Sequence, residues 1–193
     1  LTTPRELEFT TSTLTTNNGG APSSVVAIDL NGDSRPDLAV ANRLTHDVQI
    51  FLNTGRGTFL APQTITLPND ADPVAITAGD FTGDGLVDLI VASQGDNKLT
   101  LLRNAAESPF TTSTTFALSS APTSLTAGRI DADNTLDLIV TSAEGASGVF
   151  ENTGAAVLIN NGSGGFTLSA TLTTSTDPAA STLADFDRDN DLD

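Results

Sequence analysis

Four short stretches of the chain carry polar side chains at alternate positions, with Leu86 in the second stretch as the exception. In the first stretch, positions 1, 3, 5, 7 and 9 are Asp29, Asn31, Asp33, Arg35 and Asp37. In a tight turn this spacing directs successive oxygens toward one centre, and Ca²⁺ takes roughly 6 to 8 oxygen ligands. We therefore expect the side chains at positions 1, 3, 5 and 9 and the backbone carbonyl at position 7 to form a calcium site.

The other three loops vary this pattern. Gly32, Gly83 and Gly85 stand where the backbone must turn sharply, as glycine allows. In the third loop Arg129 replaces the acid at position 1, so we expect this loop to bind calcium weakly or not at all, with the guanidinium paired to the loop carboxylates. The candidate ligands of these loops are Asp80, Thr82, Asp84, Leu86 and Asp88; Asp131, Asp133, Thr135 and Asp137; and Asp185, Asp187, Asp189, Asp191 and Asp193.

Spacing excludes two other kinds of calcium loop. An EF-hand loop needs a bidentate Glu at position 12, where this chain has Val40 and Val91. Nonapeptide β-helix repeats would recur every nine residues, but these loops recur about every 50. The remaining alternative is that the acidic residues are solvated turn formers, since Asp and Asn are common in turns.

The charge balance limits the partners. Eight Lys and Arg against 24 Asp and Glu give a formal net charge of −16, which repels phosphate backbones and anionic lipid surfaces. The four loops hold 14 of the 24 acids, so cations are the natural counterpart and calcium is expected to be structural. With no Cys or Tyr and one His, the chain offers little for acid–base or nucleophilic work, and we expect it not to be an enzyme.

The chain is a repeat. The first positions of the four loops, Asp29, Asp80, Arg129 and Asp185, are 51, 49 and 56 residues apart, and a proline precedes each by seven residues. Each of the first three loops is followed by an Asn that closes a later apolar run and, six residues on, by a Phe. These pairs are Asn53 and Phe59, Asn104 and Phe110, and Asn160 and Phe166.

Short β-branched and aliphatic runs between turn residues predict strands and no helices. In the first repeat we expect strands at 24–28, 38–41, 48–52 and 59–67. Four strands in about 50 residues match one β-propeller blade, so the predicted fold is all-β, a propeller of four-stranded antiparallel blades.

The repeat divides the chain into three blades with a partial blade at each end, as part of a larger ring. The expected segments are the last strand of a preceding blade, a blade with loop 29–37, a blade with loop 80–88, a blade with the degenerate loop 129–137 and an insertion near 142–154, and the start of a further blade with loop 185–193. Their bounds are 1–18, 19–69, 70–119, 120–175 and 176–193.

The proline, the D-x-[DN]-x-D-x-x-x-D loop, the DLAV or DLIV strand and the Asn followed by Phe resemble the FG-GAP/VCBS repeats of integrin α-subunit propellers and bacterial surface proteins. The resemblance implies a β-propeller, often seven-bladed, with calcium held between the first and second strands of a blade. It also implies extracellular adhesion or recognition, although the family includes lectins and propellers attached to enzymes.

The expected function is therefore a secreted or cell-surface module that binds a protein or glycan, does not insert into membranes and gains further blades from the rest of its chain or from another subunit. Extracellular calcium modules bind with dissociation constants of roughly 10⁻⁴ to 10⁻³ M, which favours that location. The alternatives are a lectin or enzyme-appended propeller and a structural subunit of a surface assembly. The ligand face is expected opposite the metal loops, near Arg43, His46, Asp47, Gln94, Asp96, Lys98 and the insertion 144–154.

Overall fold

The computed structural model describes residues 13–16, 19–68, 70–106, 109–131, 133–142, 154–174 and 178–184. Within these ranges the secondary structure consists of strands β1 to β14 with no helix, so the prediction of an all-β fold is confirmed. No segment of the described ranges is therefore a helix capable of crossing a membrane. The loop 185–193, Phe186 and the interior of the insertion lie outside the described residues.

The first sheet is antiparallel, with strand order β1-β2-β3-β6. The sequence locates its first three strands to within two residues, but the expected fourth strand is wrong as a continuous element. Phe59 instead pairs with Asn53 in a small separate hairpin, and the chain returns to the sheet only after Pro62, which has no N–H to donate. The strands are β1 (Pro22–Ile28), β2 (Asp37–Asn42), β3 (Asp47–Phe51), β4 (Asn53–Gly55), β5 (Thr58–Phe59) and β6 (Gln63–Thr66).

Two further sheets repeat the four-stranded antiparallel pattern. Their strand orders are β7-β8-β9-β10 and β11-β12-β13-β14. Four-stranded antiparallel sheets, consistent with propeller blades, are thus confirmed, whereas the blade boundaries remain predictions. The strands are β7 (Pro73–Gly79), β8 (Asp88–Ser93), β9 (Lys98–Arg103), β10 (Thr112–Ala117), β11 (Pro122–Gly128), β12 (Asp137–Ser142), β13 (Gly154–Asn160) and β14 (Phe166–Thr173).

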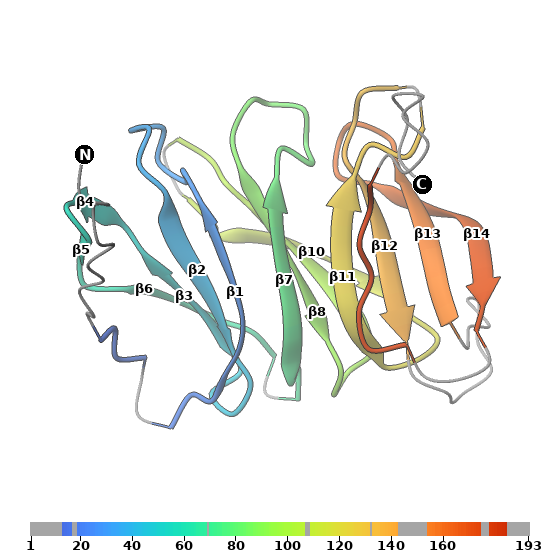
Figure 1. The fold of residues 1–193 in the computed structure, drawn as a ribbon, viewed down its shortest axis with the longest axis horizontal. Coiled ribbons are helices and arrows are strands. Elements are labelled where there is room, and N and C mark those ends of the chain that lie inside the picture. Colours follow the sequence, from blue (N-terminus) through green and yellow to red (C-terminus); the bar gives the residue numbers. More distant parts are fainter. Residues whose placement is uncertain are drawn as a thin grey trace, which may run out of the picture.

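The three sheets stand side by side, with β1 next to β7 and β7 next to β11 (Figure 1). One apolar cluster, which includes Ile50 and Leu89, fills the space between the first and second sheets. A second cluster, which includes Phe81 and Leu138, fills the space between the second and third. Every residue of β8 is buried because neighbouring sheets cover both of its faces.

The outer face of the first sheet is not covered in the same way. Val25 on β1 is 60% exposed, whereas Ile76 on β7 and Leu125 on β11, at the equivalent repeat positions, are 6% and 8% exposed. At the other end the segment 178–184 lies along β11, where Thr126 Oγ1 and Ser181 Oγ are 2.8 Å apart. The described residues form an open row, so ring closure and the number of blades remain predictions.

Candidate metal centre

The first acidic loop wraps around the carboxylate of Asp29. Its Oδ1 accepts hydrogen bonds from the amides of Gly32 and Asp33 at 2.8 and 3.1 Å, and its Oδ2 accepts one from Ser34 at 2.6 Å. Gly32 and Ser34, at positions 4 and 6, have left-handed φ of 78° and 64°. This conformation turns successive amides toward one side chain, which closes the loop.

The second loop has the same geometry around Asp80. The amides of Gly83 and Asp84 donate to its Oδ1 at 2.7 and 3.2 Å, and the amide of Gly85 donates to its Oδ2 at 2.9 Å. Gly83 and Gly85 have φ of 72° and 82°, which confirms that glycine serves the sharp turns here. Two loops 51 residues apart thus adopt one structure.

Asp29 remains charged despite its partial enclosure by the loop. Burial alone would raise the pKa of Asp29, but the hydrogen bonds from the amides of Ser34, Gly32, Asp33 and Asn31 outweigh it and hold the pKa below its usual value. An anion stabilised in this way is the form that a cation requires.

Positions 1, 3 and 5 of the first loop lie together. Asn31 Nδ2 donates to Asp33 Oδ2 at 2.9 Å, and the amide of Asp33 donates to Asn31 Oδ1 at 3.0 Å. The guanidinium of Arg35 forms an ion pair with Asp33. The Arg35 side chain therefore partly neutralises the cluster to which its backbone carbonyl is expected to contribute.

The aspartates at position 9 have a different environment. Asp37, Asp88 and Asp137 are fully buried at the start of the second strand of each sheet. Asp37 Oδ2 accepts the amide of Leu30 at 3.0 Å, and its Oδ1 accepts the amide of Asn53 at 2.7 Å. Each of these carboxylates thus joins its own loop to the end of its third strand, a role that sequence reasoning missed.

Burial shifts the pKa of Asp88. Desolvation raises this pKa and the negative charge of Asp84 adds to the effect, whereas the amides of Asn104 and Phe81 and the nearby hydroxyl of Thr82 only partly oppose it, so the pKa lies above its usual value. The second loop therefore holds more negative charge than its own hydrogen bonds stabilise.

Two of the three asparagines that close the third strands connect neighbouring sheets. Asn104 Nδ2 donates to the carbonyl of Leu30, at position 2 of the preceding loop, at 2.9 Å. Asn160 Nδ2 makes the equivalent bond to the carbonyl of Phe81 at 3.0 Å. Asn53 Nδ2 instead donates to Pro36 of its own sheet at 2.9 Å. The recurrence of Asn was visible in the sequence, but its reach into another repeat was not.

The third loop departs from the other two. Arg129 Nε donates to the backbone carbonyl of Asn134 at 3.1 Å. Within the described residues Arg129 forms no ion pair with the loop carboxylates, so the expected pairing is wrong. The amide of Asp133 lowers the pKa of Asp131, but burial, a side-chain hydrogen bond with Asp133 and the charges of Asp133 and Asp137 outweigh it and raise the pKa.

The donor set fits a hard cation in its chemistry. In the first two loops every side chain at positions 1, 3, 5 and 9 offers an oxygen as a metal ligand, and the amide of Asn31 adds the one nitrogen among them. The buried Thr82 Oγ1, at position 3 of the second loop and beside Asp88, makes no hydrogen bond of ordinary geometry among the described residues. No three acidic or histidine side chains of those residues gather as a preformed cluster, so a bound ion would need the neutral oxygens of the loop as well as its carboxylates.

The turns expected to form a ligand face are engaged within the protein. Arg43 donates to Asp72 and Gln94 of the second sheet, and His46 Nδ1 accepts the amide of Asp72 at 3.1 Å. The remaining members pair locally: Asp47 accepts from Asn42, and Lys98 forms an ion pair with Asp96. These side chains connect sheets or brace turns.

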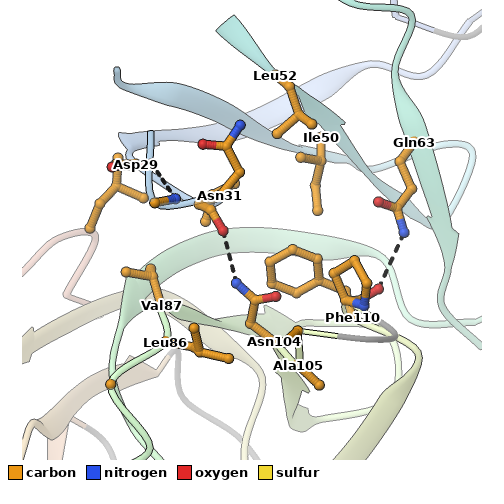
Figure 2. Close-up of a pocket in the computed structure, with 16 residues that line it drawn as sticks. Asp29, Asn31, Ile50, Leu52, Gln63, Leu86, Val87, Asn104, Ala105 and Phe110 are labelled. Atoms are coloured by element: carbon orange, nitrogen blue, oxygen red, sulfur yellow. Dashed lines mark hydrogen bonds between the residues drawn. The ribbon is translucent and has the colours of Figure 1, made fainter. Parts of the chain in front are cut away.

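A cavity of about 650 Å³ lies between the first loop and the second sheet (Figure 2). Its walls are mostly apolar, with Ile50 and Leu52 on the side of the first sheet and Val87 and Phe110 on the side of the second. Phe110 has a φ of 59°, which is unusual for a bulky residue. Among the described residues that line it, Asp29 is the one with a charged side chain.

The fold and the loops together define a class. Successive four-stranded antiparallel sheets, each with an acidic loop between its first and second strands, are built like the blades of a β-propeller. A family model described as FG-GAP-like repeat matches residues 29–91 and 80–140, and each match begins at position 1 of a loop. These matches cover more than half of the chain, which therefore belongs to the FG-GAP-like repeat family. No curated protein matches it.

Proposed function

We propose that the loops 29–37 and 80–88 each bind one structural calcium ion. The observation that carries this proposal is the shared wrapping of amides around Asp29 and Asp80, which fixes the turn that alternate oxygen ligands require. In each loop the ligands are the side chains at positions 1, 3, 5 and 9 and the carbonyl at position 7. The loop 129–137 has no acid at position 1 and is the weak site.

Unbalanced charge supports a cation. The second loop combines Asp80, Asp84 and the buried Asp88, whose pKa is raised by burial and by the charge of Asp84. A divalent ion would reduce this repulsion and could bind Thr82 Oγ1, which makes no hydrogen bond of ordinary geometry among the described residues. Position 3 is neutral in both loops, Asn31 in the first and Thr82 in the second, so each site offers three carboxylates.

The module acts outside the cell as a non-catalytic propeller that binds a protein or glycan. FG-GAP-like repeats are typical of extracellular proteins, and the low affinity of extracellular calcium loops matches the calcium found there. A second candidate function is a structural subunit of a surface assembly. It is favoured because Arg43 and His46, which were expected on a ligand face, hold the first and second sheets together instead.

A calcium titration tests the metal proposal directly. The calcium-free protein is titrated by calorimetry, and thermal unfolding is followed with calcium and with chelator. We expect binding in the range of about 10⁻⁴ to 10⁻³ M and a lower unfolding midpoint with chelator. The Asp29→Ala variant should lose one ion per chain. An unchanged midpoint together with no heat of binding would refute the proposal.

A further inference from the structure

A chain of hydrogen bonds connects the first acidic loop to the second. The amide of Leu30 donates to Asp37, and the carbonyl of the same residue accepts from Asn104 Nδ2 at 2.9 Å. The amide of Asn104 donates to Asp88 Oδ1 at 2.8 Å. Asp88 Oδ2 then accepts the amide of Phe81, in the second loop, at 3.2 Å. Both loops are thus joined through one asparagine and one aspartate.

The same series of hydrogen bonds continues to the third loop. The carbonyl of Phe81 accepts from Asn160 Nδ2 at 3.0 Å, and the amide of Asn160 donates to Asp137 Oδ1 at 2.9 Å. Asp137 Oδ2 accepts the amide of Ile130 at 2.9 Å. The pattern is therefore a repeating unit of the fold, present at both junctions between described sheets.

Every side chain that takes part in this series of hydrogen bonds is buried. Asp88 is 0% exposed, Asn104 6% and Asn160 1%. Hydrogen bonds in a low-dielectric interior are stronger than in water and polarise their neighbours, and a partner that moves away leaves a costly unpaired group. A shift of the Leu30 peptide therefore changes the hydrogen bond from the Asn104 side chain and, through the Asn104 amide, the hydrogen bond to Asp88.

The side chain of Leu30 also packs into the apolar cluster between the first and second sheets, and Asn104 adds a directional hydrogen bond to the backbone of the first loop. The first loop faces the second sheet across the 650 Å³ cavity, which separates the two surfaces over part of their area. Figure 2 shows Asn104 reaching from the second sheet to the loop backbone. The other hydrogen bond drawn across this cavity, from Gln63 to Pro109, comes from β6 and not from the loop.

We propose that Asn104 couples calcium binding at loop 29–37 to calcium binding at loop 80–88. This inference rests on the proposed function. An ion in the first loop fixes the Leu30 peptide, which holds Asn104 and Asp88 in place, and Asp88 is both an anchor and an expected ligand of the second loop. Binding is therefore positively cooperative, and the effect is reciprocal, as linkage requires.

Site-resolved titration tests the coupling. Calcium binding at each loop is followed by NMR through the amide resonances of Gly32 and Gly83. In the intact protein, Asp29→Ala should weaken calcium binding at loop 80–88 about fivefold or more. In the Asn104→Ala background, the same substitution should leave that affinity unchanged.

A matched control is the Asn53→Ala variant. Asn53 occupies the same repeat position as Asn104, but its side chain donates within its own sheet. The Asn53→Ala background should preserve the effect of Asp29→Ala on the second loop. Equal coupling in the Asn104→Ala and Asn53→Ala backgrounds would overturn the role of Asn104.

A second measurement covers the case in which Asn104→Ala does not fold. In an Asp80→Ala protein, calcium added to the remaining first site should slow hydrogen exchange at the amide of Phe81. Unchanged exchange, with Gly32 shifting normally, would refute the coupling and leave the proposed function intact. If Gly32 does not respond at calcium concentrations up to about 10 mM, the proposed function itself fails.

Discussion

Arg43, which follows β2 of the first sheet, forms a bidentate ion pair with Asp72, which precedes β7 of the second. Its Nε lies 2.5 Å from Oδ1 of Asp72, and its Nη2 lies 2.8 Å from Oδ2. The carboxylate of Asp72 raises the pKa of Arg43 by hydrogen bonding and by its charge. Because the guanidinium also reaches Gln94 at 3.2 Å, one side chain joins two turns of the neighbouring sheet.

We expect Arg43→Lys to destabilise the protein by about 0.5 to 1 kcal/mol, because lysine cannot reproduce the two parallel bonds and the pair is partly exposed to solvent. Urea unfolding at low and high salt measures the change. A loss that is independent of salt would show that the packing of the arginine stem, and not the ion pair, is what matters.

The position 9 aspartates allow the structural and metal roles of an acid to be separated. In the third loop, where calcium binding is not expected, Asp137 accepts the amides of Ile130 and Asn160. Asp137→Asn places an amide NH₂ against one of these donors and should cost about 1.5 to 3 kcal/mol. Denaturant unfolding should give the same loss with calcium and with chelator.

The control for that experiment is Asp133→Asn, in the same loop but exposed. Its carboxylate accepts from Thr135, and an amide oxygen can do the same, so the loss should be small. If Asp137→Asn is harmless, or if its effect disappears in chelator, then the buried carboxylates do not brace the loops in the way the hydrogen bonds indicate.

The sequence was most informative where a residue acts within its own repeat. Short apolar runs bounded by turn residues place β2 and β3 within one residue of their observed bounds, because strands that are covered on both faces are buried along most of their length. Gly32 marks its turn because few other residues adopt a left-handed backbone without strain. Such features depend on neighbours that are close in the chain.

Features that join repeats were not predictable in the same way. The regular spacing of Asn104 and Asn160 shows that the amide recurs, but nothing local indicates that it reaches the preceding loop 74 or 79 residues away. Likewise, Arg43 and His46 have the exposed polar character of a ligand surface until the second sheet is placed beside them. Only the arrangement of the sheets decides these roles.

Equivalent repeat positions give a direct measure of packing between sheets. Ile76 on β7 is 6% exposed and Val25, its counterpart on β1, is 60% exposed. Ile76→Ala should destabilise the protein by about 2 to 4 kcal/mol through lost burial and a new cavity. Val25→Ala should stay within about 0.5 kcal/mol.

Denaturant unfolding of the two variants provides the comparison. The two losses can be compared directly when the free energy of unfolding falls with denaturant concentration at the same slope in both variants. A large loss for Val25→Ala would mean that another surface covers this face in solution. Dilution of the protein would then reduce the loss if that surface belonged to a second molecule.

The third loop offers a gain of function. Asn134 already has a φ of 71°, close to the 64° of Ser34 at the same position of the first loop, so position 6 has the left-handed conformation found where an acid stands at position 1. Arg129→Asp supplies that acid. We expect the variant to bind one more calcium ion per chain than the unsubstituted protein.

The Arg129→Asp substitution should lower the stability of the protein in chelator and raise it in calcium. In chelator, Arg129→Asp adds a carboxylate to a loop in which neighbouring charges already raise the pKa of Asp131, so its unfolding midpoint should fall. At a calcium concentration ten times the dissociation constant of the new site, binding should add about 1.4 kcal/mol of stability. Arg129→Ala removes the guanidinium without adding a ligand and should gain neither the ion nor this stabilisation. An Arg129→Asp protein with the original number of ions would show that position 1 does not decide which loops hold calcium.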